Sequence, residues 1–206
     1  TCTYCGVGCQ FELNIKDVNA IEKVAGVKDL SYSVMAPAKI RFGDETRFFT
    51  VIGFPFERAS VFVESGEYKA DEGSILKNGD EGKIMIGSHY KYNNLFKKPV
   101  RARDVLDVQG RDFKVKAILN PIGNPGDDRL IYMSLDEFRE LFDVPERIDF
   151  IIVQVEPGQD VRTIAERIQK KLFNTRNVDE KNRDFSIQTP EELLSSFDGV
   201  LNIVTG

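Results

Sequence analysis

Residues 83–121 have the sequence KIMIGSHYKYNNLFKKPVRARDVLDVQGRDFKVKAILNP, in which short apolar segments alternate with polar breaks. KIMIG predicts a strand, and SHYKYNNLF after it predicts a short helix. VLDVQ and FKVKAIL are rich in strand-forming residues and flank Gly110, so they predict a hairpin. Glycines and short polar breaks are frequent from 55 to 129, which indicates a small β-rich lobe crossed by one helix.

Helix and strand patterns continue on both sides of this lobe. On the amino-terminal side, residues 17–27 predict a helix capped by Asp17, and residues 30–54 predict a hairpin that turns at 43–45. On the carboxyl-terminal side strands and helices alternate: strands at 129–133, 149–156 and 185–189, and helices at 134–142, 158–174 and from 189 onward.

The segment DFIIVQVE, residues 149–156, is apolar on both faces and predicts a central strand. Ser134 with Glu137, and Thr189 with Glu192, have the spacing of capping boxes at the starts of two helices. The predicted fold class is therefore α+β. Residues 17–54 plus 130–206 would form a helix-covered lobe with a mixed sheet, and residues 55–129 a smaller inserted β-rich lobe.

Composition and charge restrict the class of function. The chain has 206 residues, a net charge of −5 and no basic cluster, so the sequence predicts no nucleic-acid binding. It contains no apolar run of 18 residues and no pattern typical of a signal peptide. It begins at Thr1 without an initiator Met and ends in the apolar GVLNIVTG, which suggests a piece of a longer polypeptide.

The order of these segments resembles the periplasmic core domain of MacB-type ABC transporter permeases, a group that includes LolC/LolE-type lipoprotein-releasing permeases and relatives of FtsX. The resemblance covers residues 17–206. It rests on DVNAIEKVAGVKDLSYSV, FTVIGFPFE, SGEYKADEG, the block at 83–121, YMSLDEF, IIVQVEPGQDVRTIAERIQKKL and FSIQTPEEL.

The resemblance implies an extracytoplasmic, non-catalytic domain between the first two transmembrane helices of a permease, and no resident cofactor. Thr1 would follow the first of these helices, and GVLNIVTG would lead into the second. The implied partners are the membrane-embedded helices of the same polypeptide, a second permease subunit and a cytoplasmic ATPase subunit. Such domains are thought to couple ATP hydrolysis mechanically to the export or release of a peptide, lipoprotein or drug.

The three cysteines, Cys2, Cys5 and Cys9, lie together at the start of the chain. CTYCGVGCQFELNIKD locally resembles the leader of formate dehydrogenases and other molybdopterin oxidoreductases, where a fourth cysteine completes the ligands of a [4Fe–4S] cluster. This chain has no fourth cysteine. An iron–sulfur or other redox module, a disulfide with one thiol left over, and reduced cysteines are all compatible with the spacing. The sequence therefore predicts that residues 1–16 form a separate cysteine-bearing segment, and an origin foreign to the domain is a further alternative.

The aromatic-rich stretch RFFTVIGFPFERASVFVE, residues 47–64, is the candidate partner or substrate surface. It holds more phenylalanines than one strand face can bury: Phe48, Phe49, Phe54, Phe56 and Phe62. The candidate surface residues among them are Phe49, Phe54, Phe56 and Phe62. Two interpretations follow: core packing between the two lobes, or an apolar groove for a lipid, peptide or partner domain.

Three further polar residues are of types that can serve as ligands or catalysts. His89 is the one histidine, and it suits a helix surface better than a base or metal ligand, because no motif places a partner for it. Asp127 and Asp128 lie in GNPGDDR, but the regular spacing of a calcium loop is missing. We therefore expect a solvated turn there.

Overall fold

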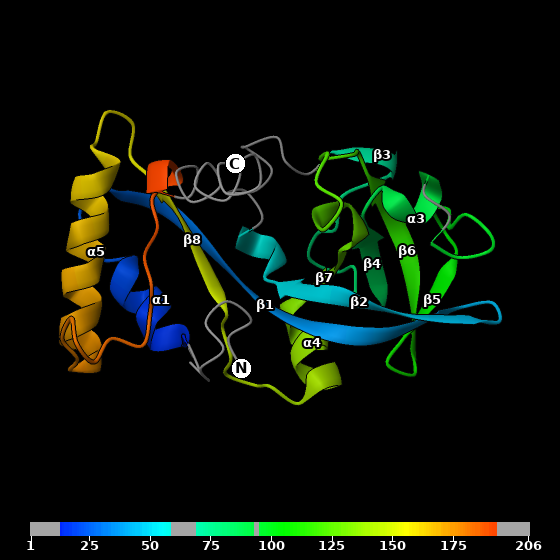
Figure 1. Cartoon of the computed structure of the whole chain (residues 1–206), viewed down its shortest axis with the longest axis horizontal. Helices are drawn as coiled ribbons and strands as arrows, with labels where there is room; N and C mark the ends of the chain where they lie inside the picture. Colours follow the sequence, from blue (N-terminus) through cyan, green and yellow to red (C-terminus); the bar gives the residue numbers. More distant parts are fainter. Residues whose placement is uncertain (1–12, 59–68, 93–94, 193–206) are drawn as a thin grey trace, which may run out of the picture. The chain divides into compact units, whose positions relative to one another are not determined.

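The computed structural model describes residues 13–58, 69–92 and 95–192 (Figure 1). The chain forms two compact units. Unit 1 contains Thr1–Leu30 and Val153–Gly206, and unit 2 contains Ser31–Ile152.

Unit 1 is built on two helices that pack side by side, α1 (Ile15–Ile21) and α5 (Val161–Arg176) (Figure 1). Gly26 makes close packing in unit 1 feasible: its φ is +100°, and a Cβ there would collide with the side chain of Ile164 on α5. The apolar residues buried in this unit are Val18, Ala20, Ile21, Val24, Leu30, Ile164, Ile168, Leu172 and Phe185.

The start of α1 differs from the prediction. Asn14, not Asp17, is the N-cap, because its side chain accepts the backbone N–H of Lys16 at 2.9 Å. Asp17 is the N3 residue and accepts the backbone N–H of Asn14 at 2.9 Å. The two residues form a reciprocal capping box that the sequence pattern placed three residues too late.

The chain after α5 is only partly as predicted. Residues 185–189 belong to no strand, so the strand predicted there is wrong. The capping box after it is confirmed: the Thr189 N–H donates to Glu192 at 2.8 Å, and the Glu192 N–H donates to Thr189 Oγ1 at 3.3 Å. The rest of this helix lies outside the described residues.

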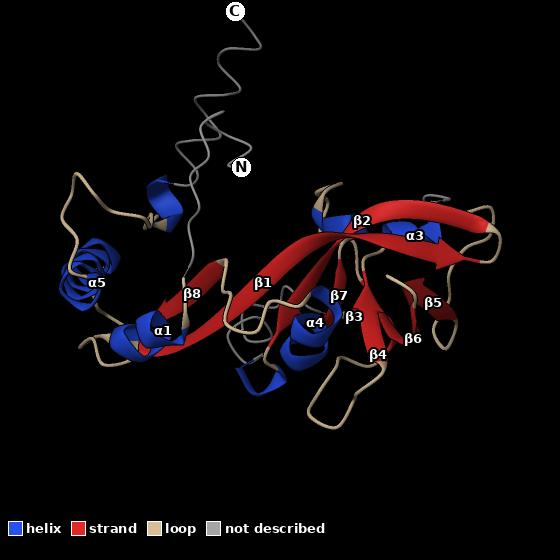
Figure 2. Ribbon diagram, turned by 90° about the horizontal axis from the view of Figure 1, so that it is seen from below, coloured by secondary structure: helices blue, strands red, loops and turns tan. Residues whose placement is uncertain are grey.

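Unit 2 is built on a mixed sheet. Its strands are β1 (Val27–Phe42, shared with unit 1), β2 (Glu45–Phe54), β3 (Ala70–Gly73), β4 (Lys83–Ile86), β5 (Val105–Val108), β6 (Arg111–Leu119) and β7 (Ile131–Ser134). The order is β2-β7-β4-β6-β5-β1, and β1 also pairs with β2, so the pairings close into a ring (Figure 2). The β2–β7 and β4–β6 pairs are parallel and the others antiparallel. Closure leaves these strands without a long free edge.

Short helices complete unit 2: α3 (His89–Tyr92), α4 (Leu135–Phe142) and the 3₁₀ turns at Phe56–Arg58 and Asp127–Arg129. Ser134 caps α4 as predicted, accepting the N–H of Glu137 at 3.2 Å. One core cluster of unit 2 consists of Phe54, Leu76, Met85, Ala117, Leu119 and Tyr132.

The α+β class with a mixed sheet is confirmed, but the predicted position of one strand in the sheet is wrong. β8 (Phe150–Val155) stands at the end of the strand order beside β1, so the prediction of a central strand is wrong. Its Phe150 and Ile152 side chains are exposed, which shows that apolar residues on both faces do not require burial on both. The lobes expected at 17–54 plus 130–206 and at 55–129 stay a prediction. Unit 2 contains all of 31–152.

Candidate functional site

A pocket of about 480 Å³ lies in unit 2, and we call it the unit 2 pocket. It is lined by residues of β1, the 55–57 segment, the 78–81 turn, the start of β6, and α4. Its lining residues are Tyr32, Pro55, Phe56, Glu57, Asn78, Gly79, Glu81, Arg111, Ser134, Leu135, Asp136, Glu137, Arg139 and Glu140. A volume of this size suits a side chain or a small ligand.

One buried carboxylate, that of Glu137, connects several segments that line the unit 2 pocket. Glu137 is 5% exposed, and its Oε1 accepts the N–H of Gly82 at 2.7 Å and Arg111 at 3.2 Å. Its other oxygen accepts the hydroxyl of Ser134 at 3.1 Å. Arg111 also reaches Glu140 at 3.2 Å. Because these bonds join α4 to β6 and to the turn before β4, Glu137 acts as an internal support rather than as a free acid.

Other carboxylates of the pocket are not neutralised in this way. Glu57, Glu81 and Asp136 are exposed and pair with no cation among the described residues. Arg139 lines the same pocket, and its Nε is buried without a hydrogen-bond partner in the described part of the chain. The pocket therefore carries a surplus of negative charge beside one unsatisfied donor.

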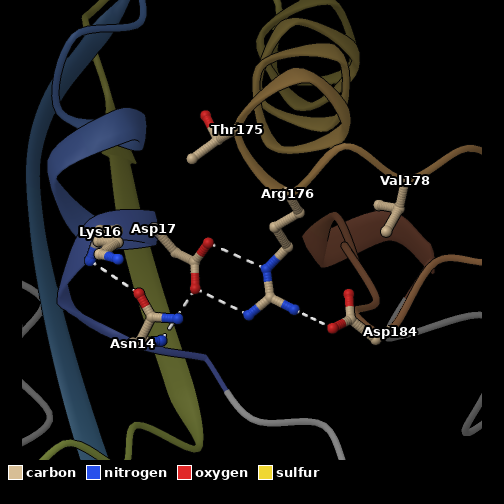
Figure 3. Close-up of a pocket in the computed structure, with 7 residues that line it drawn as sticks. All are labelled: Asn14, Lys16, Asp17, Thr175, Arg176, Val178 and Asp184. Atoms are coloured by element: carbon tan, nitrogen blue, oxygen red, sulfur yellow. Dashed lines mark hydrogen bonds and ion pairs between the residues drawn. The ribbon is translucent and has the colours of Figure 1, made fainter.

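The second pocket, of about 430 Å³, lies in unit 1 and is lined by Asn14, Lys16, Asp17, Thr175, Arg176, Val178 and Asp184 (Figure 3). Arg176 points between two carboxylates in this view. It holds Asp17 through two hydrogen bonds, of 3.0 Å from Nε and 2.8 Å from Nη2, and it also pairs with Asp184. Asp17 is 1% exposed.

Arg176 is held in its charged form. Its pKa is raised above the ordinary value, chiefly by the hydrogen bonds to Asp17, while burial acts in the opposite direction and Asp184 adds to the increase. A bidentate arginine–carboxylate pair joins 17 and 176 with fixed geometry. The charges of Arg176, Asp17 and Asp184 pair with one another. The unit 1 pocket therefore contains a stabilising ion-pair network rather than a reactive site.

The four phenylalanines of the predicted aromatic surface do not share one environment. Phe54 is 2% exposed in the core of unit 2, so it offers no ring to a partner. Phe49 is half-buried, with its ring centroid 5.1 Å from that of Tyr90. Phe56 is half-buried against Phe54 and lines the unit 2 pocket. Phe62 lies outside the described residues, so a partner surface stays a prediction for Phe49, Phe56 and Phe62.

The predicted cysteine site, Cys2, Cys5 and Cys9, also lies outside the described residues. The [4Fe–4S] cluster and the disulfide both stay sequence-based predictions. Within the described ranges, no group of three or more His, Cys, Asp or Glu side chains is placed to hold a metal ion.

Asp128 has a structural role that the sequence did not indicate. It is 3% exposed and accepts the N–H groups of Ile122 and Gly123 at 2.9 and 3.1 Å and the hydroxyl of Ser88 at 3.0 Å. Burial raises the pKa of Asp128, but these hydrogen bonds and His89 outweigh burial and lower it overall. The turn at Asp127 and Asp128, which was expected to be solvated, is thus held by hydrogen bonds to the buried Asp128 side chain.

His89 lies beside this turn. Its Nδ1 accepts a hydrogen bond from Arg129 Nε at 3.4 Å, and its Nε2 is 4.0 Å from Asp128. The hydroxyl of Ser88 donates to Asp128 rather than to His89, so the three residues do not form a nucleophile–base pair.

Asp80 is a second buried acid that sequence reasoning missed. It is 5% exposed and pairs with Lys83 at 2.8 Å and with Lys116, which joins the start of β4 to β6. Burial raises the pKa of Asp80, but the hydrogen bonds from Lys116, Lys83 and Lys77 lower it well below its ordinary value. A lone Asp in a KNGDEGK turn carries no sequence signal of burial, since the partner on β6 is 36 residues away.

No helix in the described ranges combines the length and apolar character needed to cross a membrane.

Comparison with known proteins gives concordant results. Residues 7–171 match the family described as the MacB-like periplasmic core domain. The chain is 30% identical over 191 residues to an uncharacterised ABC transporter permease of Methanocaldococcus jannaschii; the match covers 92% of this chain and 46% of that protein. The chain thus spans about half the length of this relative.

Two solved structures share the fold. The periplasmic region of MacB from Actinobacillus actinomycetemcomitans gives a TM-score of 0.72 at 14% identity, covering 92% of this chain and 84% of that one. The extracellular domain of the noncanonic ABC-type transporter YknZ from Gram-positive bacteria gives 0.66 at 17% identity, covering 82% and 87%. At these identities the likeness establishes the fold alone.

Proposed function

The chain belongs to the MacB-like periplasmic core domain family of ABC transporter permeases, and we propose that it transmits ATP-driven motion to a transported molecule without catalysing a reaction itself. The match of residues 7–171 to this family is the observation that carries the proposal. As a member of this family the chain is an extracytoplasmic domain of a permease.

The path of the chain supports transmission of motion. β1 is one continuous strand of 16 residues that contributes to both units, and β8 likewise contributes to both. Because both strands continue from one unit into the other, a displacement of unit 1 would act on unit 2 through the backbone. The buried acids Glu137, Asp128 and Asp80 are committed to structural bonds, as expected of a body that moves as a whole.

The proposed partners are the membrane-embedded helices of the same polypeptide, a second permease subunit and a cytoplasmic ATPase subunit. The proposed cargo is a peptide, lipoprotein or drug. The match covers 46% of the length of the Methanocaldococcus jannaschii relative, and these partners would involve sequence outside the chain.

The test is a distance measurement in the full-length transporter. Cys2, Cys5 and Cys9 are first replaced by Ser, and Glu146, which is exposed, is replaced by Cys and spin-labelled in both permease subunits. We expect the distance between the two labels to differ by several ångströms between the nucleotide-free and the ATP-bound transporter.

A control pair of labels at positions 48 and 146 of one subunit should keep its distance, because both residues belong to unit 2. If the distance between subunits stayed fixed while ATP was hydrolysed and cargo moved, mechanical transmission by this domain would be excluded.

The Cys→Ser background also tests the redox alternative. An iron–sulfur cluster would give the anaerobically purified wild-type chain bound iron and a brown colour, and both would disappear in Cys5→Ser. A colourless, iron-free wild-type chain would remove that alternative.

A further inference from the structure

The unit 2 pocket has an unbalanced charge. Its lining contains the carboxylates of Glu57, Glu81, Asp136, Glu137 and Glu140 and the guanidinium groups of Arg111 and Arg139, a surplus of three negative charges. Arg111 is already occupied by Glu137 and Glu140. Low-dielectric walls around charges of one sign concentrate the field, so the pocket attracts cations.

The carboxylates that create this surplus face solvent. Glu57, Glu81 and Asp136 are exposed and pair with no cation among the described residues, whereas the buried Glu137 is fully engaged. The exposed carboxylates of the pocket are therefore available to accept hydrogen bonds from a ligand, whereas the carboxylate of Glu137 is used in bonds within the chain.

Four of the remaining lining residues are apolar or aromatic, beside Asn78, Gly79 and Ser134. Tyr32, Pro55 and Leu135 are buried and Phe56 is half-buried, and all four line the same pocket. Such a surface suits the methylene stem of a lysine or arginine, whose charged end reaches the carboxylates. A bare inorganic cation would make no use of these side chains.

Arg139 also lines the pocket, and its Nε is buried. It has no hydrogen-bond partner in the described part of the chain, and an unsatisfied buried donor is costly. A backbone carbonyl of a bound peptide could accept from this donor if the side chain turned its Nε toward the pocket. Cationic side chains and backbone carbonyls occur together in a peptide.

We propose that the unit 2 pocket binds a lysine- or arginine-bearing segment of a partner protein. Negative charge, apolar walls and an unsatisfied donor meet in this one pocket. The proposal goes beyond transmission of motion. Its test uses the 206-residue chain alone, so failure here would leave the distance measurement in the full transporter unaffected.

The probe is a capped hexapeptide that alternates leucine and lysine, titrated into the isotope-labelled chain and followed by amide chemical shifts. We expect shifts at 55–57, 78–82 and 134–140, where the chain lines the pocket. Binding should weaken strongly between about 0.01 M salt, where the Debye length is about 30 Å, and about 1 M, where it is about 3 Å.

The matched variants change the same number of charges. Glu57→Gln with Glu81→Gln should weaken binding about fivefold, the combined loss of two exposed ion pairs. Glu146→Gln with Glu166→Gln removes two exposed carboxylates that lie outside the pocket, and it should leave the affinity unchanged. If the double variant Glu57→Gln, Glu81→Gln fails to fold, the single variant Glu81→Gln and the salt dependence test the same proposal.

Four results would overturn the proposal. They are equal weakening by both pairs of variants, equal binding of a leucine–glutamate hexapeptide, shifts that lie outside the pocket, and calcium chloride reproducing the shifts while the peptide produces none. The last would make the pocket an inorganic cation site.

Discussion

At the residue scale, the described ion pairs differ in burial, and burial decides how much stability is lost when one partner is removed. Asp17 is 1% exposed, whereas the side chain of Asp184 on the other side of Arg176 is 47% exposed. Removing one partner of a buried pair leaves an uncompensated charge, while an exposed pair is replaced by water at little cost.

Asp17→Asn should therefore lower the free energy of unfolding by about 3 kcal/mol, and Asp184→Asn by less than about 1 kcal/mol. Urea denaturation of the two variants and the wild-type chain measures both. Equal losses would show that burial of Asp17 does not strengthen its pairing with Arg176.

The buried acid Asp80 predicts a dependence of stability on pH. Its pKa in the folded chain is lowered below the ordinary value of 3.8, chiefly because the lysine hydrogen bonds outweigh the opposing effect of burial. A carboxyl with a lowered folded pKa stabilises the fold above its unfolded pKa, and this stability is lost as the pH falls toward the folded value.

Asp80→Asn should thus cost about 2 kcal/mol at pH 7, the value of a hydrogen-bonded charged group. The difference between the variant and the wild-type chain should shrink as the pH is lowered through 3.8. Urea denaturation at several pH values measures this difference. A difference that is constant down to pH 2 would contradict the assignment.

At the element scale, the two predicted hairpin turns and two of the three predicted helix caps are confirmed. The β5–β6 hairpin turns at Gln109 and Gly110, with φ of 56° and 90°, as in a type I′ turn. Asp107 accepts the N–H of Gly110 at 2.9 Å, which fixes the turn. Gln109 carries a side chain in a left-handed conformation that asparagine and glycine adopt more readily.

Gln109→Asn should raise the free energy of unfolding by about 0.5 kcal/mol, because it relieves part of this backbone strain. Gln109→Val should lower it by at least 1 kcal/mol, as β-branched residues tolerate a positive φ poorly. Thermal denaturation of the pair tests the turn. Stabilisation by valine would mean that the turn is not type I′.

At the scale of the whole molecule, each unit has its own buried cluster and its own buried ion pairs. Asp17 and Arg176 belong to unit 1, and Asp80 and Lys116 belong to unit 2. Contiguous groups of residues with their own core often open as separate cooperative units.

A substitution in one unit should therefore speed native-state hydrogen exchange in that unit and leave exchange in the other unit unchanged. Asp17→Asn should speed exchange in α1 and α5 and leave β4 and β6 protected, and Asp80→Asn should do the reverse. Uniform loss of protection in both variants would show that the chain opens as a single unit.

The sequence by itself determined the α+β class, most strands and helices, the capping residues Ser134 and Thr189, and the resemblance that the family match confirmed. These features depend on local periodicity, turn chemistry and residue order, which are written in neighbouring residues. Position within the sheet is not local. For this reason β8 was expected at the centre and lies at the end of the strand order.

Only the tertiary structure decided the pairing of groups far apart in the chain. Asp17 meets Arg176 across 159 residues, and Glu137 meets Gly82 across 55. Of the unit 2 pocket, the sequence indicated Phe56 alone. The acidic residues around it lie on separate elements and resemble ordinary surface charges until closure of the sheet gathers them. Burial and long-range contact, which decide whether a carboxylate is a support or a binding group, depend on the packed chain.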